Sequence, residues 1–348
     1  MTLVPLPSQP DGVPWPTAEW PEGALPAGVE LDGLLDRVCD DNGPLAQTYA
    51  VVVVHRGTVV AERYQGQLEH FDRPPDPVTG ETRLLSWSMA KSMLHAAVGL
   101  LVGERRLDLD APADVPEWAA PDDPRHAITL RHLLAMRDGL DFVEDYVDER
   151  VSDVIEMLFG AGQADMAHFA ADRPLAAAPD TRFNYSSGTS NIISGIVSRA
   201  VGHGPSYERF LREGLFDRIG MRSATPEFDA AGTWVASSYL RATARDFARF
   251  GLLYQRDGMW DGTRVLPDGW VDYGRTIESV DPVDGPYGAH WWGVEGDTLG
   301  TFRASGYEGQ SITICPTLDL LVARLGKTSA DHYPDLSAWR ADLVRAFS

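Results

Sequence analysis

The chain contains little cysteine, and acidic residues far outnumber basic ones. Only Cys39 and Cys315 occur, far apart and without metal-binding or redox spacing, so the sequence gives no support to a disulfide scaffold or to C-x-x-C chemistry. The 30 basic and 51 acidic residues give a formal net charge of −21, which repels phosphate backbones and anionic lipid surfaces. We therefore expect no nucleic acid and no membrane among its partners.

Long apolar stretches are also missing. No run is apolar enough to span a bilayer, and residues 1–23 lack the basic start and continuous apolar core of a secretion signal. These absences predict a cytoplasmic location. The length of 348 residues, with 44% hydrophobic and 23% charged residues, is typical of a compact globular protein with one large domain or two closely packed lobes.

The beginning of the chain predicts an arm followed by antiparallel strands. Prolines recur through residues 1–28 and block helix interiors and central strands, so this segment is expected to be an irregular arm over the surface. A helix is predicted near residues 31–39. Two β-branched runs on either side of residues 55–57 then predict a hairpin.

The rest of the chain predicts two lobes of different composition. Helical patterns dominate residues 88–224, while short strand candidates and a final helix follow to residue 348. We expect an α+β fold in which residues 29–87 and 225–348 build one antiparallel sheet from both chain ends, flanked by helices. Residues 88–224 are expected to form a mainly helical lobe beside it.

Several common catalytic motifs are absent. The sequence has no G-x-S-x-G nucleophile elbow and no H-E-x-x-H pair, and "LGKTS" has Leu321 where a phosphate-binding loop needs glycine. No histidine carries a local signature of the base in a Ser-His-Asp triad. The sequence therefore predicts no metal ion and no organic cofactor.

What stands out instead is "SMAK", where Ser88 precedes Lys91 by three residues at the start of a predicted helix, 88–102. Residues i and i+3 share one helix face, so the amine can reach the hydroxyl, and the helix start favours an anion at the serine. A lysine accepts a proton only when burial lowers its pKa from the usual value of about 10.4. The tetrapeptide alone equally fits a serine at a helix start beside an exposed lysine.

Two later segments supply further candidates. Tyr185 lies in a turn rich in Ser, Gly and Asn, just before a helix predicted at 187–201, and its phenol either projects into a cleft or packs in the core. The strand candidate "FRASGY" places the small Ser305 and Gly306 where a substrate can lie along the backbone, or where a tight turn needs them. The residues alone leave both alternatives open.

Taken in this order, the three pieces resemble the serine β-lactamase and penicillin-binding-protein superfamily, in particular its class C and esterase-like branch with the 6-aminohexanoate-dimer (nylon-oligomer) hydrolases. The likeness runs from about residue 30 to 348 and includes "EDYVD", "TARDFARFG", "YGAHWWG" and "GYEGQ". It implies a β-lactamase-like fold with Ser88 as the acylated nucleophile, Lys91 as its base and Tyr185 as the group that passes a proton to the leaving group. The N–H groups of Ser88 and Tyr307 would form the oxyanion hole.

The resemblance also implies residues that bind substrate. Tyr146 matches the "EDY" tyrosine that contacts the scissile amide, and Ser305 and Gly306 belong to the strand along which the substrate lies. Trp291 and Trp292 give the site an apolar wall or belong to the core. The acidic run that contains Tyr146 either favours a substrate amine or is a solvated loop; its members are Asp138, Asp141, Glu144, Asp145, Asp148 and Glu149.

Two departures from the family pattern affect the expected substrate. Ser187 stands where the second motif usually has Asn, and Ala304 stands where the third has Lys, so a cation that grips substrate carboxylates is missing, although Arg303 is its neighbour in sequence. β-Lactams and D-alanyl peptides carry such a carboxylate. Small amides or esters therefore fit this site better.

These inferences predict a serine hydrolase that cleaves small amides or esters through an acyl-enzyme, with linear amides of the 6-aminohexanoate-dimer type among its candidate substrates. The alternatives are a carboxylesterase, a weak β-lactamase or D-alanyl carboxypeptidase-like enzyme, and a non-catalytic binding module of the same fold. The expected partner is a small molecule. The natural substrate and the oligomeric state stay open.

Overall fold

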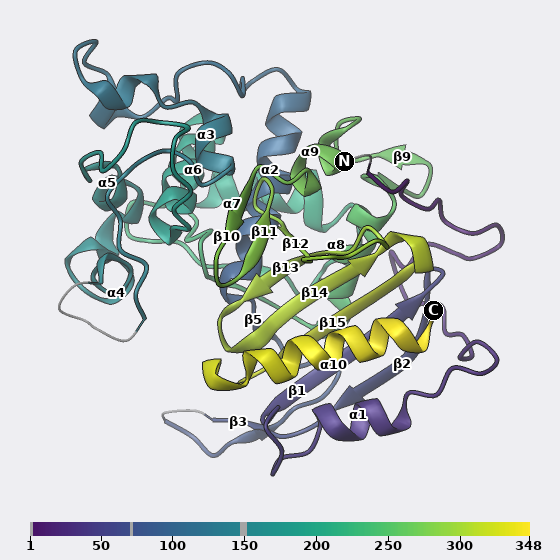
Figure 1. The fold of residues 1–348 in the computed structure, drawn as a ribbon. Coiled ribbons are helices and arrows are strands. Elements are labelled where there is room, and N and C mark those ends of the chain that lie inside the picture. The colour runs from purple at the N-terminus through teal and green to yellow at the C-terminus, as the bar shows by residue number, and fades with distance from the viewer. Residues whose placement is uncertain (1–2, 70–71, 147–151) are drawn as a thin grey trace.

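The computed structural model describes residues 3–69, 72–146 and 152–348, and its centre is an eight-stranded antiparallel sheet (Figure 1). The strand order is β10-β11-β12-β13-β14-β15-β1-β2, so strands from both chain ends share one sheet. The α+β prediction with a β-lactamase-like sheet is therefore confirmed. The strands are β1 Thr48–His55, β2 Thr58–Tyr64, β10 Ser279–Asp281, β11 Gly285–Tyr287, β12 Trp292–Gly293, β13 Phe302–Gly306, β14 Gln310–Cys315 and β15 Leu320–Gly326.

The predicted hairpin is formed by β1 and β2. Its two-residue turn has positive φ at Arg56 (51°) and Gly57 (77°), which is the geometry that suits the twist of antiparallel strands. β1 is buried over nearly its whole length because it lies between β15 and β2 and is covered on both faces. Its run of four valines fits this position, since a strand buried on both faces needs no alternation of polar and apolar residues.

Helices cover both faces of the sheet. α1 (Asp32–Val38) and α10 (Tyr333–Ala346) pack on the face that presents Val51 and Val53, while α8 (Ala244–Gln255) packs on the face of Val52 and Val54. The side chains of adjacent strand residues point to opposite faces, which is why the valines of β1 belong to two separate hydrophobic clusters. Figure 1 shows α10 running across the sheet close to α1.

The second lobe is helical and packs around α2 and α6. The helix predicted at 187–201 has those limits in the structure, whereas the predicted helix at 88–102 begins as a 3₁₀ turn (Trp87–Met89) and continues as α2. α5 was not predicted because six residues give little periodicity. The remaining helices are α2 Ala90–Gly103, α3 Leu130–Leu134, α4 Asp153–Phe159, α5 Met166–Ala171, α6 Ser187–Val201, α7 Pro205–Leu211 and α9 Trp270–Arg275.

Three small sheets lie outside the central sheet. One of them joins strands from three distant segments and so places residues 237–242 beside residues 84–86. The residue limits expected for the two lobes stay a prediction. The short strands are β3 Gln67–Leu68 with β4 Asp76–Pro77, β5 Leu84–Leu85 with β7 Leu240–Ala242 and β6 Thr225–Pro226, and β8 Met259–Trp260 with β9 Thr263–Arg264.

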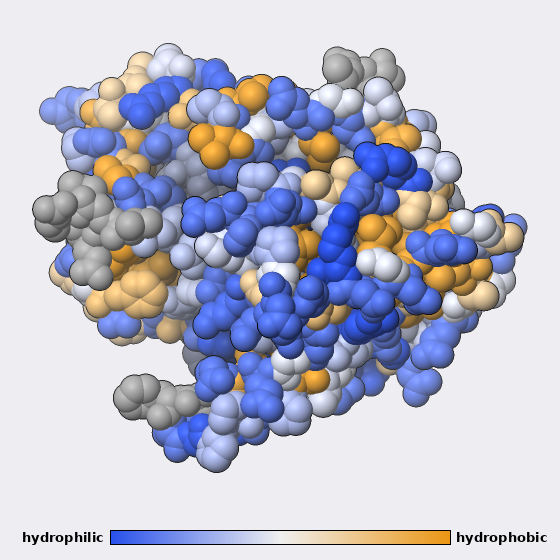
Figure 2. Space-filling model, turned by 60° about the horizontal axis from the view of Figure 1, so that its bottom comes forward, coloured by the Kyte–Doolittle hydropathy of each residue, from blue (hydrophilic) through white to orange (hydrophobic). Residues whose placement is uncertain are grey.

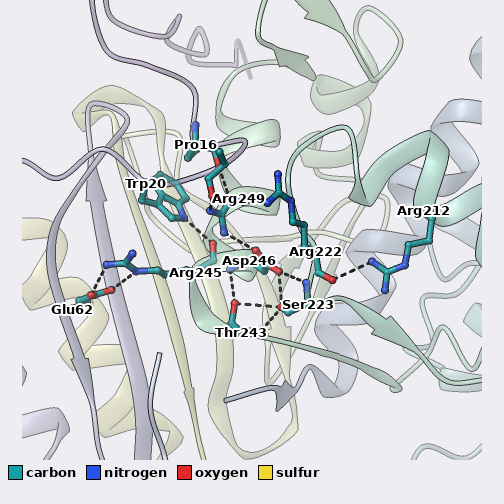
Figure 3. A network of polar contacts seen from close by, with 11 residues as sticks. Pro16, Trp20, Glu62, Arg212, Arg222, Ser223, Thr243, Arg245, Asp246 and Arg249 are labelled. Atoms are coloured by element: carbon teal, nitrogen blue, oxygen red, sulfur yellow. Dashed lines mark hydrogen bonds and ion pairs between the residues drawn. The ribbon is translucent and has the colours of Figure 1, made fainter. Parts of the chain in front are cut away.

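The N-terminal segment has little regular structure and is bound firmly to the sheet lobe (Figure 3). The indole N–H of Trp20 donates to the Arg245 carbonyl at 3.1 Å, and Arg249 Nε donates to the Pro16 carbonyl at 2.6 Å. Trp20 is 5% exposed and packs in the main hydrophobic cluster. The segment therefore contributes to the core.

The face drawn in Figure 2 is covered mainly by hydrophilic residues, with hydrophobic residues in small groups between them. Among the residues that the structure describes, no helix has the length and apolar character needed to cross a membrane. The cytoplasmic location stays a prediction.

The ion pair at the start of α8 gives a prediction about stability. Asp246 accepts from Arg249 at 2.6 Å and from the backbone N–H and hydroxyl of Ser223 at 2.8 and 2.5 Å, and both charged side chains are less than 10% exposed. Replacing Asp246 by Ala leaves a buried guanidinium without its counter-ion, so we expect Asp246→Ala to lower the free energy of unfolding by about 3–5 kcal/mol. Urea denaturation measures this loss.

The control is Glu227→Ala, which removes one partner of an exposed ion pair with Arg241. Exposed pairs contribute about 0–1 kcal/mol, so this variant should unfold almost like the parent. Equal losses in the two variants would contradict the structural role given to Asp246.

Candidate active site

Ser88 lies in the 3₁₀ turn that leads into α2, and the preceding chain is fixed on both sides. The hydroxyl of Ser86 donates to the Ser238 carbonyl at 3.2 Å and accepts from the Leu240 N–H at 3.2 Å. Trp87 then takes a left-handed backbone conformation with φ 44°, which is uncommon outside glycine and tends to occur at functional sites. This turn presents a partly exposed Ser88 at the N-terminal end of α2.

Lys91 follows one turn later and is buried, with 2% of its surface exposed. Its Nζ lies 2.9 Å from Ser88 Oγ, 3.1 Å from Ser187 Oγ and 2.9 Å from the Ser237 carbonyl oxygen. The structure thus brings together the serine and lysine that the sequence paired. The alternative of an exposed lysine is wrong, because α6 and the segment after β6 cover the amine.

Burial changes the acidity of this amine. It lowers the pKa of Lys91 from 10.5 to about 8, and the nearby carboxylate of Glu144 acts in the opposite direction. The drop corresponds to about 3 kcal/mol of destabilisation of the ammonium form relative to the neutral amine. At pH 7 about a tenth of the molecules would therefore carry a neutral Lys91, a form that can accept a proton.

The hydrogen bonds around Lys91 also set the direction of its lone pair. The Ser237 carbonyl only accepts, and Ser187 Oγ donates to Glu144 Oε1 at 2.5 Å, so both groups take an N–H from Lys91. A neutral amine has two N–H groups and one lone pair. The remaining direction, toward Ser88 Oγ, is therefore left for the lone pair.

Tyr185 completes the group beside the serine. It lies two residues before α6, and Lys91 Nζ lies 5.0 Å from the centre of its ring. Burial raises the pKa of Tyr185 above its ordinary value, and a hydrogen bond with Ser88 acts in the opposite direction. The phenol therefore keeps its proton at neutral pH and lies against the same hydroxyl as the lysine. Its ring contacts Trp292 and Tyr287, with centroids 5.3 and 5.9 Å away.

The end of β13 lies directly against the serine. A Cβ atom on Gly306 would come within 2.5 Å of the Ser86 carbonyl oxygen and 3.1 Å of the Ser88 nitrogen, so only glycine lets the strand approach this closely. Because Tyr307 directly follows Gly306, this close approach brings the backbone N–H groups of Ser88 and Tyr307 to the same end of β13. Ser305, which lies in β13 two residues before Tyr307, accepts a hydrogen bond from Arg303 Nε at 3.1 Å.

Aromatic rings border this edge on the solvent side. Tyr307 and Tyr146 are 41% and 40% exposed and stack with their ring centroids 5.2 Å apart, and the Trp87 ring meets Tyr307 edge-on at 5.7 Å. The hydroxyl of Tyr146 donates to Glu144. The "EDY" segment thus lies beside Ser187 and Tyr307, and the contact of Tyr146 with a scissile amide stays a prediction.

Trp291 is a correction. The sequence left open whether it walls the site or belongs to the core, and the structure places it in the core, where it is fully buried among Phe250, Tyr254 and Phe302. Its neighbour Trp292 is the ring that contacts Tyr185. Adjacent strand residues point to opposite faces, so only one of the two indoles can reach the site.

Two groups at the site were not singled out from the sequence. Glu144 was considered only as one acid in a run, yet its carboxylate accepts from the Ser187 N–H at 2.7 Å as well as from the hydroxyl of the same residue. The Ser237 carbonyl had no sequence signal, since any residue carries one. Another acid of the run, Asp138, is buried and accepts a hydrogen bond from the Thr189 hydroxyl at 2.6 Å. Asp148 and Glu149, which belong to the same run, lie outside the described residues.

No metal site is evident in the described ranges 3–69, 72–146 and 152–348, where no group of three or more His, Cys, Asp or Glu side chains is arranged to hold an ion. The chemistry available at the site comes from an alcohol, an amine of lowered pKa and a phenol. Such a group suits nucleophilic attack with proton transfer.

Comparison with known proteins agrees with this geometry. The family model described as Beta-lactamase matches residues 45–346. A 6-aminohexanoate-dimer hydrolase of Paenarthrobacter ureafaciens is 29% identical over an alignment of 337 residues in length. The match covers 89% of this chain and 80% of that protein. A Bacillus anthracis structure provisionally assigned to the same activity superposes with a TM-score of 0.77 at 22% identity, covering 99% of this chain and 90% of that one. The hydrolase EstCE1 superposes with a TM-score of 0.69 at 16% identity, covering 90% and 97% of the two chains.

The fold and the family match together define a serine hydrolase of the β-lactamase class. The chain belongs to the beta-lactamase family. This membership favours an enzyme over the binding module that the sequence had left open. The solved structures, at identities of 16% and 22%, support the fold alone.

The opposing effects of burial and Glu144 on Lys91 lead to a prediction. Because a carboxylate stabilises the ammonium form, Glu144→Gln should lower the pKa of Lys91 below the value of about 8 in the parent protein. The chain has only two lysines, Lys91 and the exposed Lys327, so NMR of protein labelled with [ε-¹³C]lysine gives one signal for the site and one internal reference.

The matched control is Glu308→Gln, since Glu308 also lies at the site, bound to the Trp87 indole at 3.1 Å, but does not act on Lys91. This variant should leave the Lys91 titration unchanged. An unchanged or higher pKa in Glu144→Gln would refute the role given to Glu144.

Proposed function

We propose that this chain hydrolyses small amides or esters through an acyl-enzyme formed on Ser88. The observation that carries the proposal is the geometry of Lys91, a buried amine 2.9 Å from the serine hydroxyl whose other two contacts leave its lone pair facing that hydroxyl. A base in this position removes the need for histidine. The family membership supports the same chemistry.

Acylation requires three chemical steps, and the groups at the site can carry out each of them. Ser88 Oγ forms a bond to the substrate carbonyl carbon while its proton passes to the neutral Lys91. The carbonyl oxygen becomes an oxyanion, which the N–H groups of Ser88 and Tyr307 would bind. The bond to the leaving group then breaks as Tyr185 gives its proton to the departing nitrogen or oxygen, and Lys91 restores the proton on Tyr185.

Deacylation repeats these steps with water. The water attacks the acyl carbon, its proton is taken up by the lysine–tyrosine pair, and the bond between Ser88 Oγ and the acyl carbon breaks as the serine regains its proton. The product is a carboxylic acid and the free enzyme. Neither half-reaction requires a metal ion or an organic cofactor.

The substrate that we favour is a short linear amide such as the 6-aminohexanoate dimer. The carboxylate-binding lysine of the family's third motif is replaced by Ala304, which is fully buried and faces the core. Tyr146 and Tyr307 stack and are partly exposed, and their rings would suit a flexible aliphatic chain. The relative from Paenarthrobacter ureafaciens carries the name of this activity.

Labelling with a fluorophosphonate tests the nucleophile. We expect one adduct, located on Ser88 by peptide mass spectrometry, absent in Ser88→Ala and formed about 100-fold or more slowly in Lys91→Met. The labelling rate should rise as the pH is raised through about 8, because the amine becomes able to accept a proton as it loses its own. A folded protein that stays unlabelled, or a label on another serine, would refute the proposal.

A substrate comparison tests the acyl donor. We expect 6-aminohexanoate dimer and a short nitrophenyl ester to be hydrolysed with kcat/KM at least ten times that of a chromogenic cephalosporin. The cephalosporin carries its carboxylate close to the scissile bond, where the missing lysine would bind it, whereas the carboxylate of the dimer lies at the far end of the leaving group. Ester turnover without amide turnover would define a carboxylesterase. Efficient hydrolysis of the cephalosporin alone would make the chain a β-lactamase and overturn the substrate assignment.

A further inference from the structure

A second hollow lies under α10, on the face of the sheet that α1 and α10 cover. It has a volume of about 320 Å³ and lies between α10, the strands β13 and β14 and the loop that connects β12 to β13. None of the residues proposed for the hydrolytic site lines it. Its size is at the low end of the range for pockets that hold small molecules.

The sheet itself explains why α10 leaves this space. Arg303, Thr313, Val322 and Val53 form one row across β13, β14, β15 and β1, and directly paired residues point to the same face. Val53 and Val322 pack beneath the apolar side of α10. Farther along the row the side chains become polar and charged, so the helix loses its apolar contact and the hollow begins there.

Two guanidinium groups line the hollow without a carboxylate partner. Arg303 donates to the Ser305 hydroxyl at 3.1 Å and to the carbonyls of Gly293 and Asp284 at 3.2 and 3.3 Å, which are all uncharged acceptors. Arg340, on α10, has a buried Nε without any hydrogen-bond partner, and no carboxylate of the described residues lies within ion-pair distance of it. Burial first, and then the positive charges of Arg303 and Arg324, lower the pKa of Arg340 to about 9.

This arrangement is costly unless an anion is present. A buried cation loses its hydration, and two neighbouring cations repel each other, so a charge of opposite sign is the usual compensation. The one acidic side chain in the lining, Asp297, is already engaged with the backbone N–H groups of Leu299 and Thr301 at 3.0 and 2.7 Å. Asp284 attracts Arg303 without forming an ion pair with it. In a chain of net charge −21, two half-buried arginines without a directly bound carboxylate from the described residues are a local feature that the overall composition does not produce.

We propose that this hollow is a binding site for a small organic anion with one carboxylate head and a short aliphatic body. A guanidinium matches a carboxylate with two parallel hydrogen bonds. The aliphatic part would contact the apolar remainder of the lining, which includes Val294, Leu299 and Val344. Inorganic phosphate shares the negative charge but has no apolar part to bury against these side chains.

Titration calorimetry with hexanoate tests the site on the whole protein. Hexanoate should bind saturably and raise the Tm, while hexanamide, which has the same body without the charge, and inorganic phosphate should bind at least ten times more weakly. Phosphate binding as tight as hexanoate would show that the aliphatic part of the proposal is wrong. The absence of saturable hexanoate binding would overturn the site.

Variants place the binding at the hollow. Arg340→Gln should weaken hexanoate binding at least tenfold, and Arg340→Lys, which keeps the charge but loses the fork of donors, should weaken it less. Arg345→Gln is the matched control: this residue also lies at the hollow, but its guanidinium is 72% exposed and paired with Asp342, so binding should stay within twofold. Equal hexanoate binding by the parent and a folded Arg340→Gln would assign the ligand to another site.

Discussion

The candidate site depends on one amine that is kept out of water. The pKa of Lys91 falls to about 8 because the protein covers the nitrogen, and this loss of hydration is the largest influence on it. Lysine is also rare in this chain, since only two of its 30 basic residues are lysines. A guanidinium stays protonated in proteins, whereas an ammonium can be made to lose its proton by burial. Position 91 therefore carries the one type of strong cation that can also become a base.

Both lobes cover this amine, and the hydrogen bonds of the buried His290 hold the lobes together. His290 donates through Nδ1 to the Leu134 carbonyl at 2.8 Å and accepts through Nε2 from the Ser190 hydroxyl at 3.1 Å, while its own carbonyl accepts from Ser92. It thus joins α2, α3 and α6 to the segment before β12. Burial lowers the pKa of His290 to about 3, so it stays neutral over the range in which Lys91 titrates. The charge of His290 therefore does not change over the pH range in which the charge of Lys91 does.

A contact in the fold or the site could be predicted from the sequence where its two residues lie close together along the chain. The serine and lysine are three residues apart on one helix, and the hairpin around Gly57 and the limits of α6 follow from equally local patterns. The contacts of Glu144 with Ser187 and of Lys91 with the Ser237 carbonyl bridge 43 and 146 residues, and no local pattern encodes them. The family resemblance supplied Tyr185, Tyr146 and the Gly306 strand, which the residues alone left ambiguous.

Trp291 illustrates a different limit. The two adjacent indoles have the same composition and hydrophobicity, and β12 has only two residues, so no alternation exists from which to decide which indole faces the core. The decision is made by the partner strand: Trp292 is paired with Arg303, on the face away from α8, while Trp291 packs against α8 and Phe302. Tertiary pairing, which the sequence does not display, selects the residue that reaches Tyr185.

The position of Glu144 shows how the site balances two requirements on the base. A carboxylate in direct contact would hold Lys91 as an ammonium, while its complete absence would leave the ammonium formed during acylation without compensation. Ser187 separates them, with its Oγ 3.1 Å from the amine and 2.5 Å from the carboxylate. A hydroxyl can accept from the amine and donate to the carboxylate through one atom. In the proposed mechanism, serine at residue 187, where the family pattern has asparagine, would keep a polar link to Lys91 and would also fix the direction from which this amine receives a proton.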